Sequence, residues 1–288
     1  ADDTNAIVIG TWPYMHCEMT CAALEAGKHV MCEARMARNA AEAHTMLKES
    51  QAHPNLIAQI VPSPFTLRVD RTIQDMIAGG YIGDLYAVTV RGTAPAFANP
   101  ETPLHWRQRQ DLSGFNILTM GIWYEAAMRW VGPASAVFAR TRIYTPQRRD
   151  QETGTLGTVD VPDHVDIVAD LACGAQATYQ FSVVCGLAPA PGAWLFGSKG
   201  TLHYDQASDK LFGGRQGEKT LQEITVAPEK AGHWRVEEEF VGAIRGQEKI
   251  QFTAFADGVK YMEFTEAVHR SATSGQIVSL PLAEFRRE

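Results

Sequence analysis

Two short segments, residues 11–16 and 33–35, carry polar side chains that could contact a ligand. They hold Thr11, Pro13, His16, Glu33 and Arg35. Each segment lies at the end of a short apolar run, residues 6–10 and 29–33, of the kind found in strands buried on both faces of a parallel sheet. Because the carboxyl ends of parallel strands meet at one edge, we expect the two segments to share a rim where α/β sheets bind ligands.

The side chains at this rim favour particular kinds of chemistry. Arg35 stays charged at any ordinary pH, so it could orient a carboxylate or phosphate but could not act as a base. Glu33 would be a carboxylate on the rim or an ion-pair partner of Arg35. Further along, His105, Trp106 and Arg107 offer a titratable nitrogen, a stacking face and a planar fork, which could form one wall of a ligand site. A loop that links two domains explains these three residues about as well. His105 is the best candidate for a general base.

The elements that must position these residues follow from the apolar pattern. A helix over residues 14–26 would join the first two strands, with Met15, Met19 and Ala23 on its apolar face and Gly27 as its C-terminal cap. A helix capped by Asn39, a strand over residues 56–61 and a helix over residues 66–78 follow. Further strands are predicted over residues 85–93, 136–144, 165–171, 175–184, 193–196 and 201–204, and further helices over residues 117–131, 234–245 and 254–274.

This order of elements predicts an α/β protein with two parts. Residues 1–64 would form a partial Rossmann-type domain with a parallel sheet. Residues 65–288 would form an open, mostly antiparallel α/β domain for substrate binding and oligomerisation, because long strands with period-2 alternation mark a sheet with one covered face.

Several of these segments resemble the Gfo/Idh/MocA family (glucose-fructose oxidoreductase and inositol dehydrogenase). Residues 8–16 and 23–33 resemble the middle of its nucleotide-binding domain, and the likeness extends to residues 106–107, 113–124, 196–202 and 277–281. The resemblance implies NAD or NADP as cofactor, and a sugar, cyclitol or related alcohol as substrate. It also implies that Thr11, Pro13 and His16 line the cofactor, that Glu33 lies near the nicotinamide ribose, and that Trp106 and Arg107 flank the ring.

The sequence departs from the family pattern where proton transfer takes place. The family usually reads Glu-Lys-Pro where this chain reads Glu33-Ala34-Arg35, so that Ala34 replaces the lysine, and it has Asp and His where this chain has Thr119 and Trp123. None of these replacements titrates near neutral pH. We therefore expect a non-standard active site shaped by Arg35, His105, Thr119 and Trp123. Trp123 could form an aromatic floor for a substrate ring, and simple packing within a buried helix explains it at least as well.

Two other functions stay open on these residues. The chain could be a catalytically degenerate helper subunit or binding protein that keeps the fold and associates with an active paralogue. It could also be an enzyme that oxidises its substrate only transiently during elimination or epimerisation.

The segment before Ala6 raises a separate question. A domain of this kind normally opens with a strand, a Gly-x-Gly-x-x-Gly turn and a helix, and residues 1–5 cannot supply them. Three explanations stay open: the chain is a fragment, the sequence begins after a further segment, or the protein has lost its pyrophosphate-binding turn. The determinants of NAD or NADP preference would lie in that part.

Composition limits the partners. The chain has 288 residues, 45% of them hydrophobic, and a formal net charge of −7, which predicts a globular protein that binds small molecules and not nucleic acid or membranes. Five scattered cysteines without metal-site spacing are expected to be buried free thiols, which fits a reducing, cytoplasmic location, and no metal is expected. An open sheet face with alternating apolar residues predicts a homo-oligomer.

Overall fold

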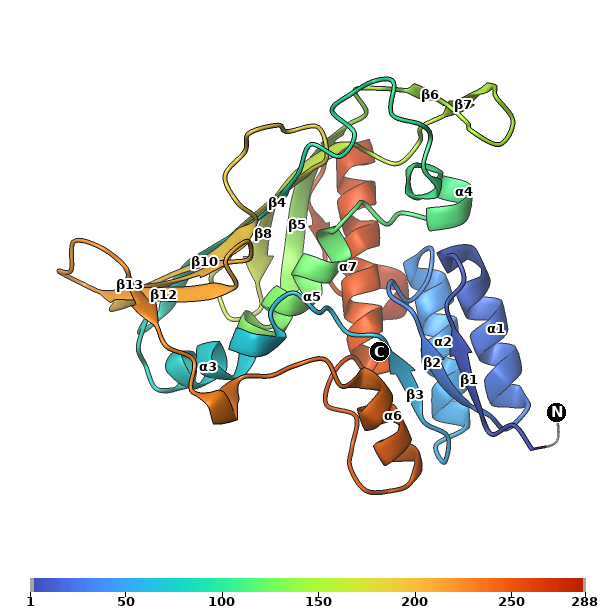
Figure 1. The fold of residues 1–288 in the computed structure, drawn as a ribbon, viewed down its shortest axis with the longest axis horizontal. Helices are drawn as coiled ribbons and strands as arrows, with labels where there is room; N and C mark the ends of the chain where they lie inside the picture. Colours follow the sequence, from blue (N-terminus) through green and yellow to red (C-terminus); the bar gives the residue numbers. More distant parts are fainter. Residues whose placement is uncertain (1–2, 287–288) are drawn as a thin grey trace.

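The computed structural model describes residues 3–286, and its first layer is the predicted parallel sheet. The elements of this layer are β1 (Ala6–Ile9), α1 (Pro13–Glu25), β2 (His29–Cys32), α2 (Ala40–Ala52) and β3 (Ala58–Ile60). The strands pair in parallel in the order β1-β2-β3 (Figure 1). Asn39 caps α2, since its side-chain oxygen accepts a hydrogen bond from the backbone N–H of Glu42. The expected crossover unit is confirmed.

A larger mixed sheet forms the second layer. Its strands are β4 (Leu85–Thr93), β5 (Ala134–Arg142), β8 (His164–Leu171), β9 (Gln176–Ser182), β10 (Gly192–Gly197), β11 (Gly200–Asp205), β12 (Lys210–Arg215), β13 (Gln222–Ile224) and β14 (Val278–Ser279). Their order is β13-β12-β11-β10-β4-β9-β8-β5-β14. The β4–β9 pair is parallel and the others are antiparallel, which confirms an open, mostly antiparallel sheet.

Helices connect the two layers. These are α3 (Leu67–Ala78), α4 (Gln110–Ser113), α5 (Met120–Val131), α6 (Val236–Ile244) and α7 (Phe255–Ser274). Figure 1 shows α7 running between the two sheets, where it packs on α2 and β5. Val236 and Phe240 of α6 pack against Met31 and Val61 at the small sheet. The C-terminal helices therefore return to the first layer, and the predicted division at residue 64 stays a prediction.

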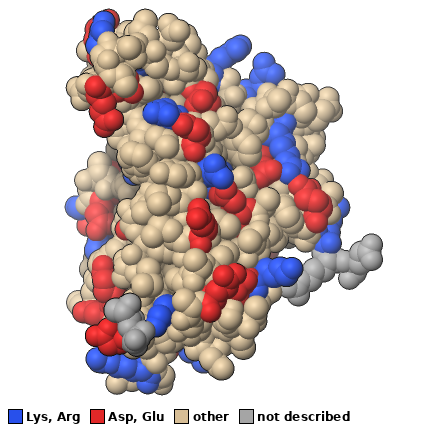
Figure 2. All heavy atoms as spheres, turned by 90° about the vertical axis from the view of Figure 1, so that its right-hand side faces the viewer, with Lys and Arg blue, Asp and Glu red and all other residues tan. Residues whose placement is uncertain are grey.

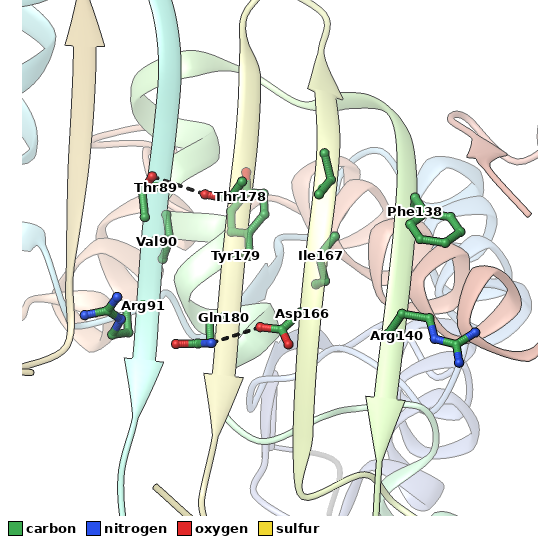
Figure 3. Close-up of a pocket in the computed structure, with 11 residues that line it drawn as sticks. Thr89, Val90, Arg91, Phe138, Arg140, Asp166, Ile167, Thr178, Tyr179 and Gln180 are labelled. Atoms are coloured by element: carbon green, nitrogen blue, oxygen red, sulfur yellow. Dashed lines mark hydrogen bonds between the residues drawn. The ribbon is translucent and has the colours of Figure 1, made fainter. Parts of the chain in front are cut away.

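The large sheet has one covered and one open face. In β8 the side chains of Val165, Ile167 and Ala169 are buried against the helices, while Asp166 and Val168 are exposed. Figure 3 shows the open face, where Asp166 and its neighbours project from four adjacent strands. This alternation is the period-2 pattern on which the strand predictions rested.

The structure differs from prediction in the buried face of one helix, the start of another and several short strands. In α1 the buried residues include His16, Thr20 and Ala23, whereas Met15 and Met19 are only half-buried. The apolar spacing was right for Ala23 but did not predict His16, because the His16 ring is buried by its backbone hydrogen bonds and not by its hydrophobicity. Helix α5 begins three residues later than predicted. The short strands β6 (Gln147–Arg149) and β7 (Leu156–Thr158), like β12 to β14, were not predicted.

The surface beside the small sheet carries charges of both signs. Figure 2 shows Lys and Arg interspersed with Asp and Glu on this face, so its described residues offer no broad basic field of the kind that nucleic acid requires. Among residues 3–286, no helix has the length and apolar character needed to cross a bilayer.

Candidate active site

The two rim segments lie together and are joined by a buried histidine. His16 Nε2 lies 2.9 Å from the carbonyl oxygen of Thr11, and its Nδ1 lies 3.0 Å from the carbonyl oxygen of Arg35. The ring therefore bridges the segments that follow β1 and β2. Both nitrogens face backbone oxygens and the side chain is buried, so the ring holds the two segments together, and cofactor contact by His16 stays a prediction.

An aromatic wall stands beside this rim. The rings of Trp12 and Trp106 stack with centroids 6.0 Å apart, and the Arg107 guanidinium lies 4.1 Å above the Trp106 ring. Trp12 is 44% exposed although it is a large aromatic residue. Trp12, His105 and Trp106 also line a hollow of about 360 Å³. The sequence prediction missed Trp12, and its place in the turn directly after β1 was the available signal.

The segment that carries this wall is held by local caps and by a distant arginine. His105 Nδ1 accepts a hydrogen bond from the backbone N–H of Arg107 at 3.1 Å, at the start of the short helix η1 (Trp106–Gln108). Buried Arg148 donates to backbone carbonyls of Phe97, Asn99, Pro100 and Thr102, all within the loop that leads to His105. Sequence reasoning missed Arg148, because nothing local marks an arginine whose partners lie about fifty residues away.

Histidine 105 has a defined tautomer and a weakened affinity for protons. Since Nδ1 accepts the Arg107 N–H, the proton of the neutral ring sits on Nε2. Desolvation lowers the pKa of His105 below its ordinary value, and the positive charge of Arg107 lowers it further. The ring is therefore neutral at pH 7, and its Nε2–H is a hydrogen-bond donor.

Arg35 is buried at the rim, and its side chain has no partner of opposite charge in the part of the chain that the structure describes. The residue is 5% exposed, and its fully buried Nε has no hydrogen-bond partner there. Burial lowers the pKa of Arg35 to about 10, and the nearby charge of Arg107 adds to this effect. Glu33 does not form the alternative ion pair with Arg35 among the described residues. Its Oε2 accepts from the backbone N–H of Ala34 at 3.1 Å instead.

The other predicted site residues turn away from Arg35. A methyl group at Gly121 of α5 would lie 2.6 Å from Arg35 Cδ, whereas one at Gly92 of β4 would lie 2.9 Å from Thr119 Oγ1 and 3.0 Å from Trp123 Cδ1. Residues two apart on a helix point to different sides. Arg35 thus packs on one side of α5, and the side chains of Thr119 and Trp123 face the large sheet on another.

The aromatic residues of α5 fill the core. Trp123 is closed off from solvent and packs against Phe65 and Tyr204, with ring centroids 5.5 and 6.3 Å away. Tyr124 stacks on Phe264. Of the two interpretations of Trp123, the structure supports packing within a buried helix. Half-buried Thr119 stays a predicted site residue.

A buried ionic network holds α3 and α5 together next to the site. Arg129 Nη1 lies 2.8 Å from Asp70 Oδ2, and Arg129 Nη2 lies 2.6 Å from Glu125 Oε1. Asp70 also accepts from Trp130 Nε1 at 2.7 Å, and Glu125 from the hydroxyl of Thr253. Burial alone would lower the pKa of Arg129, but Glu125 and Asp70 outweigh it and raise that pKa.

The cysteines take no part in the rim, and their burial differs from prediction. Cys32 is buried, Cys173 is exposed, and Cys17, Cys21 and Cys185 lie in between. Desolvation, with nearby Cys21 and Glu42, raises the pKa of the Cys17 thiol to about 12, which makes it unreactive at neutral pH. No group of three or more His, Cys, Asp or Glu side chains within residues 3–286 is arranged to hold a metal ion.

Two family models match the chain. Residues 1–59 match the oxidoreductase family with an NAD-binding Rossmann fold, and residues 71–203 match the GFO/IDH/MocA C-terminal domain. Both models describe the same group of oxidoreductases, and together they cover most of the two sheets.

Characterised relatives cover part of the chain. Levoglucosan dehydrogenase from Pseudarthrobacter phenanthrenivorans is 30% identical over 196 residues, which are 62% of this chain and 49% of the relative. A dTDP-3,4-didehydro-2,6-dideoxy-alpha-D-glucose 3-reductase from Streptomyces antibioticus is 26% identical over 211 residues, 72% of this chain and 58% of the relative. The aligned region thus spans about half the length of the first relative and less than two thirds of the second.

Solved structures share the fold over nearly the whole chain. Levoglucosan dehydrogenase in complex with NADH and L-sorbose superposes with a TM-score of 0.84 at 24% identity, covering 97% of this chain and 80% of that one. An oxidoreductase domain protein from Kribbella flavida gives a TM-score of 0.83 at 25% identity, covering 98% and 81%. These matches confirm the predicted fold class, and the two family models confirm the resemblance seen in the sequence. The chain belongs to the GFO/IDH/MocA family of oxidoreductases.

Proposed function

We propose that the protein is an NAD- or NADP-dependent oxidoreductase that acts on a sugar, cyclitol or related alcohol through a non-standard active site. The observation that carries this proposal is the rim itself. His16 ties the ends of β1 and β2 together, and the Trp12–Trp106 stack stands beside them. The relatives that act on sugars support the substrate class.

The rim fits the nicotinamide half of such a cofactor. A Cβ placed on Gly10 would have no neighbour within 4 Å, and Trp12 presents an exposed ring two residues later. Thr11, Trp12, Pro13 and Trp106 would hold this half of the cofactor, with Glu33 near its ribose. When bound, the cofactor supplies the acceptor for a hydride from the substrate carbon. The chain's own part is to keep water from that carbon and to position the substrate hydroxyl.

We propose that His105 is the residue that exchanges a proton with the substrate hydroxyl. Its Nε2–H can donate to a substrate oxygen. To act as a base it must take the proton on Nδ1, which requires release of the hydrogen bond from the Arg107 N–H. Arg35, Ala34 and Thr119 cannot take a proton near neutral pH.

Nicotinamide binding tests the proposal. Titrating NADH and NADPH against tryptophan fluorescence should show saturable quenching, and Trp12→Ala should weaken binding about tenfold, since an aromatic stack contributes roughly 1–3 kcal/mol. The matched control is Trp234→Ala, because Trp234 is 43% exposed and lies beside α6. Equal losses in both variants, or no binding by the parent protein, would argue against the proposed rim.

The pH dependence of turnover tests the role of His105. Because its pKa lies below 6.5, the rate should fall on the acid side only below that pH. Removing the charge in Arg107→Met should raise the pKa of His105 and move this acid limb to higher pH. Arg215→Met is the control, since Arg215 is also exposed and lies 4.5 Å above a ring, that of Tyr81. A limb that Arg107→Met leaves unmoved would argue against His105 as the titrating group.

The burial of Trp123 favours one other function, the helper subunit. A protein whose matched positions hold inert or packed side chains could retain cofactor binding without turnover. Under this alternative NADH still binds, no alcohol in a sugar and cyclitol panel is oxidised, and an active paralogue co-purifies. Turnover of any panel alcohol by the protein alone would exclude it.

We also propose that the open sheet face is covered by a second copy of the chain. This face carries exposed Phe138 and Val168, and it holds a hollow of about 360 Å³ whose lining includes Thr89, Arg91 and Gln180 (Figure 3). Exposed apolar side chains on a sheet face mark an association surface. A monomeric mass in sedimentation at micromolar concentration would argue against it.

A further inference from the structure

The guanidinium of Arg35 lacks the partners that buried arginines normally have. Within residues 3–286 no carboxylate lies within ion-pair distance of it, and its side chain makes no hydrogen bond. Nε is fully buried, while the two terminal nitrogens, equally without partners, are in contact with solvent. A buried charge of this kind destabilises the protein unless a bound ligand neutralises it and accepts its hydrogen bonds.

The path of the Arg35 side chain is shaped by its neighbours. The side chain passes over Gly121 of α5, where even a methyl group would collide with Cδ at 2.6 Å. Its backbone is held by His16, and the following residue, Met36, donates its N–H to the hydroxyl of Tyr261 at 2.6 Å. Helices α1, α5 and α7 thus fix an arginine that is not neutralised by any of them.

A second arginine lies close to the first. Arg107 lies over the ring of Trp106, which stacks on Trp12, and Trp12 follows Thr11, whose carbonyl shares the His16 ring with that of Arg35. The charge of Arg107 acts on Arg35, and Arg107 makes no ion pair among the described residues. The charge of Glu33 acts on Arg107, while the Glu33 carboxylate accepts a hydrogen bond from the Ala34 N–H. Two arginines and one glutamate leave one uncompensated positive charge at the rim.

We propose that Arg35, with Arg107, forms a subsite for the carboxylate of the substrate, which makes the substrate a sugar acid or a related polyhydroxy acid. This inference rests on the proposed function and narrows its substrate class. A planar guanidinium binds a carboxylate through two parallel N–H donors. The single surplus charge matches a monoanionic carboxylate better than a doubly charged phosphate. A neutral sugar offers Arg35 hydroxyl acceptors but no negative charge, so it would leave the surplus positive charge uncompensated.

Direct binding separates these ligands. Calorimetry with D-glucuronate, D-gluconate, D-glucose and D-glucose 6-phosphate should be run with and without NADH. At least one of the two acids should bind about 10- to 150-fold tighter than glucose, the range given by a charge-assisted hydrogen bond, and the preference should shrink with added salt. Equal binding of acids and glucose, absence of acid binding, or tighter binding of the phosphate would overturn the carboxylate assignment.

Variants locate the effect. Arg35→Met should abolish the preference for acid, so that acid and glucose bind alike, and Arg107→Met should reduce the preference by a smaller factor. Gly121→Ala should also reduce it, because the added methyl displaces Arg35 while both charges remain. Arg215→Met, at a similar exposed cation–ring contact, should have no effect. If Arg35→Met does not fold, the parent protein and Arg107→Met still decide the question. Equal binding of acid and glucose by the parent, or a preference for acid that Arg107→Met leaves unchanged, would overturn the subsite.

The two proposals fail in different ways. If NADH does not bind but the acid preference and its loss in the variants persist, the oxidoreductase proposal fails and the carboxylate subsite stands. If NADH binds and no acid is preferred over glucose, the subsite fails alone.

Discussion

Replacing Arg129 with methionine is expected to lower the free energy of unfolding by about 3–5 kcal/mol, the range seen when one member of a buried ion pair is removed. Arg129 lies between Asp70 of α3 and Glu125 of its own helix α5, at 2.8 and 2.6 Å. Both carboxylates are buried, so the variant would leave two negative charges facing each other without a cation. Methionine keeps much of the volume, which isolates the effect of charge.

Urea unfolding followed by tryptophan fluorescence measures this loss. The control is Arg71→Met on α3, because Arg71 pairs with Asp75 at 3.2 Å but is 70% exposed. Exposed pairs contribute about 0–1 kcal/mol, so that variant should unfold close to the parent protein. Similar midpoints for the two variants would show that the buried network does not hold α3 and α5 together.

The sequence predicted those features that depend on local pattern. The apolar runs and the crossover rule placed residues 11–16 and 33–35 on one rim, as the His16 bridge between Thr11 and Arg35 bears out. The alternation in β8 gave its covered face. Where a residue was buried for its hydrogen bonds and not for its hydrophobicity, as with His16, the pattern did not predict its burial.

Features that depend on contacts between distant residues could not be predicted. Trp123 and Arg35 were both expected near one site, but their directions are set by Gly92 of β4 and Gly121 of α5, and spacing along the chain does not reveal which side of α5 faces which layer. The carbonyl groups that accept hydrogen bonds from Arg148 likewise lie far from it in the sequence, and only the tertiary fold brings them together. The strands and loops around the site could therefore be predicted more reliably than the side chains that point into it.

Arg35→Met is expected to have the opposite sign to Arg129→Met and to stabilise the ligand-free protein by about 1–3 kcal/mol. Arg35 is buried, no carboxylate within residues 3–286 lies within ion-pair distance of it, and burial lowers its pKa to about 10 because the charge loses hydration. Removing an unpaired buried charge relieves that penalty, whereas removing the shared cation of a network creates one.

Adding a carboxylate ligand should make the parent protein more stable than Arg35→Met, the reverse of the order expected without ligand. A carboxylate present at about 1,000 times its dissociation constant adds about 4.1 kcal/mol to the folded parent, more than the roughly 1–3 kcal/mol gained by the variant, and it should add much less to Arg35→Met. Urea midpoints with and without D-glucuronate or D-gluconate would show both changes, with Arg215→Met expected to follow the parent protein throughout. A structural arginine would behave otherwise: Arg35→Met would then unfold more easily without ligand, and acid would stabilise parent and variant equally. The sign of the change in the free energy of unfolding of the ligand-free protein therefore separates an arginine that stabilises the fold from one that binds an anion.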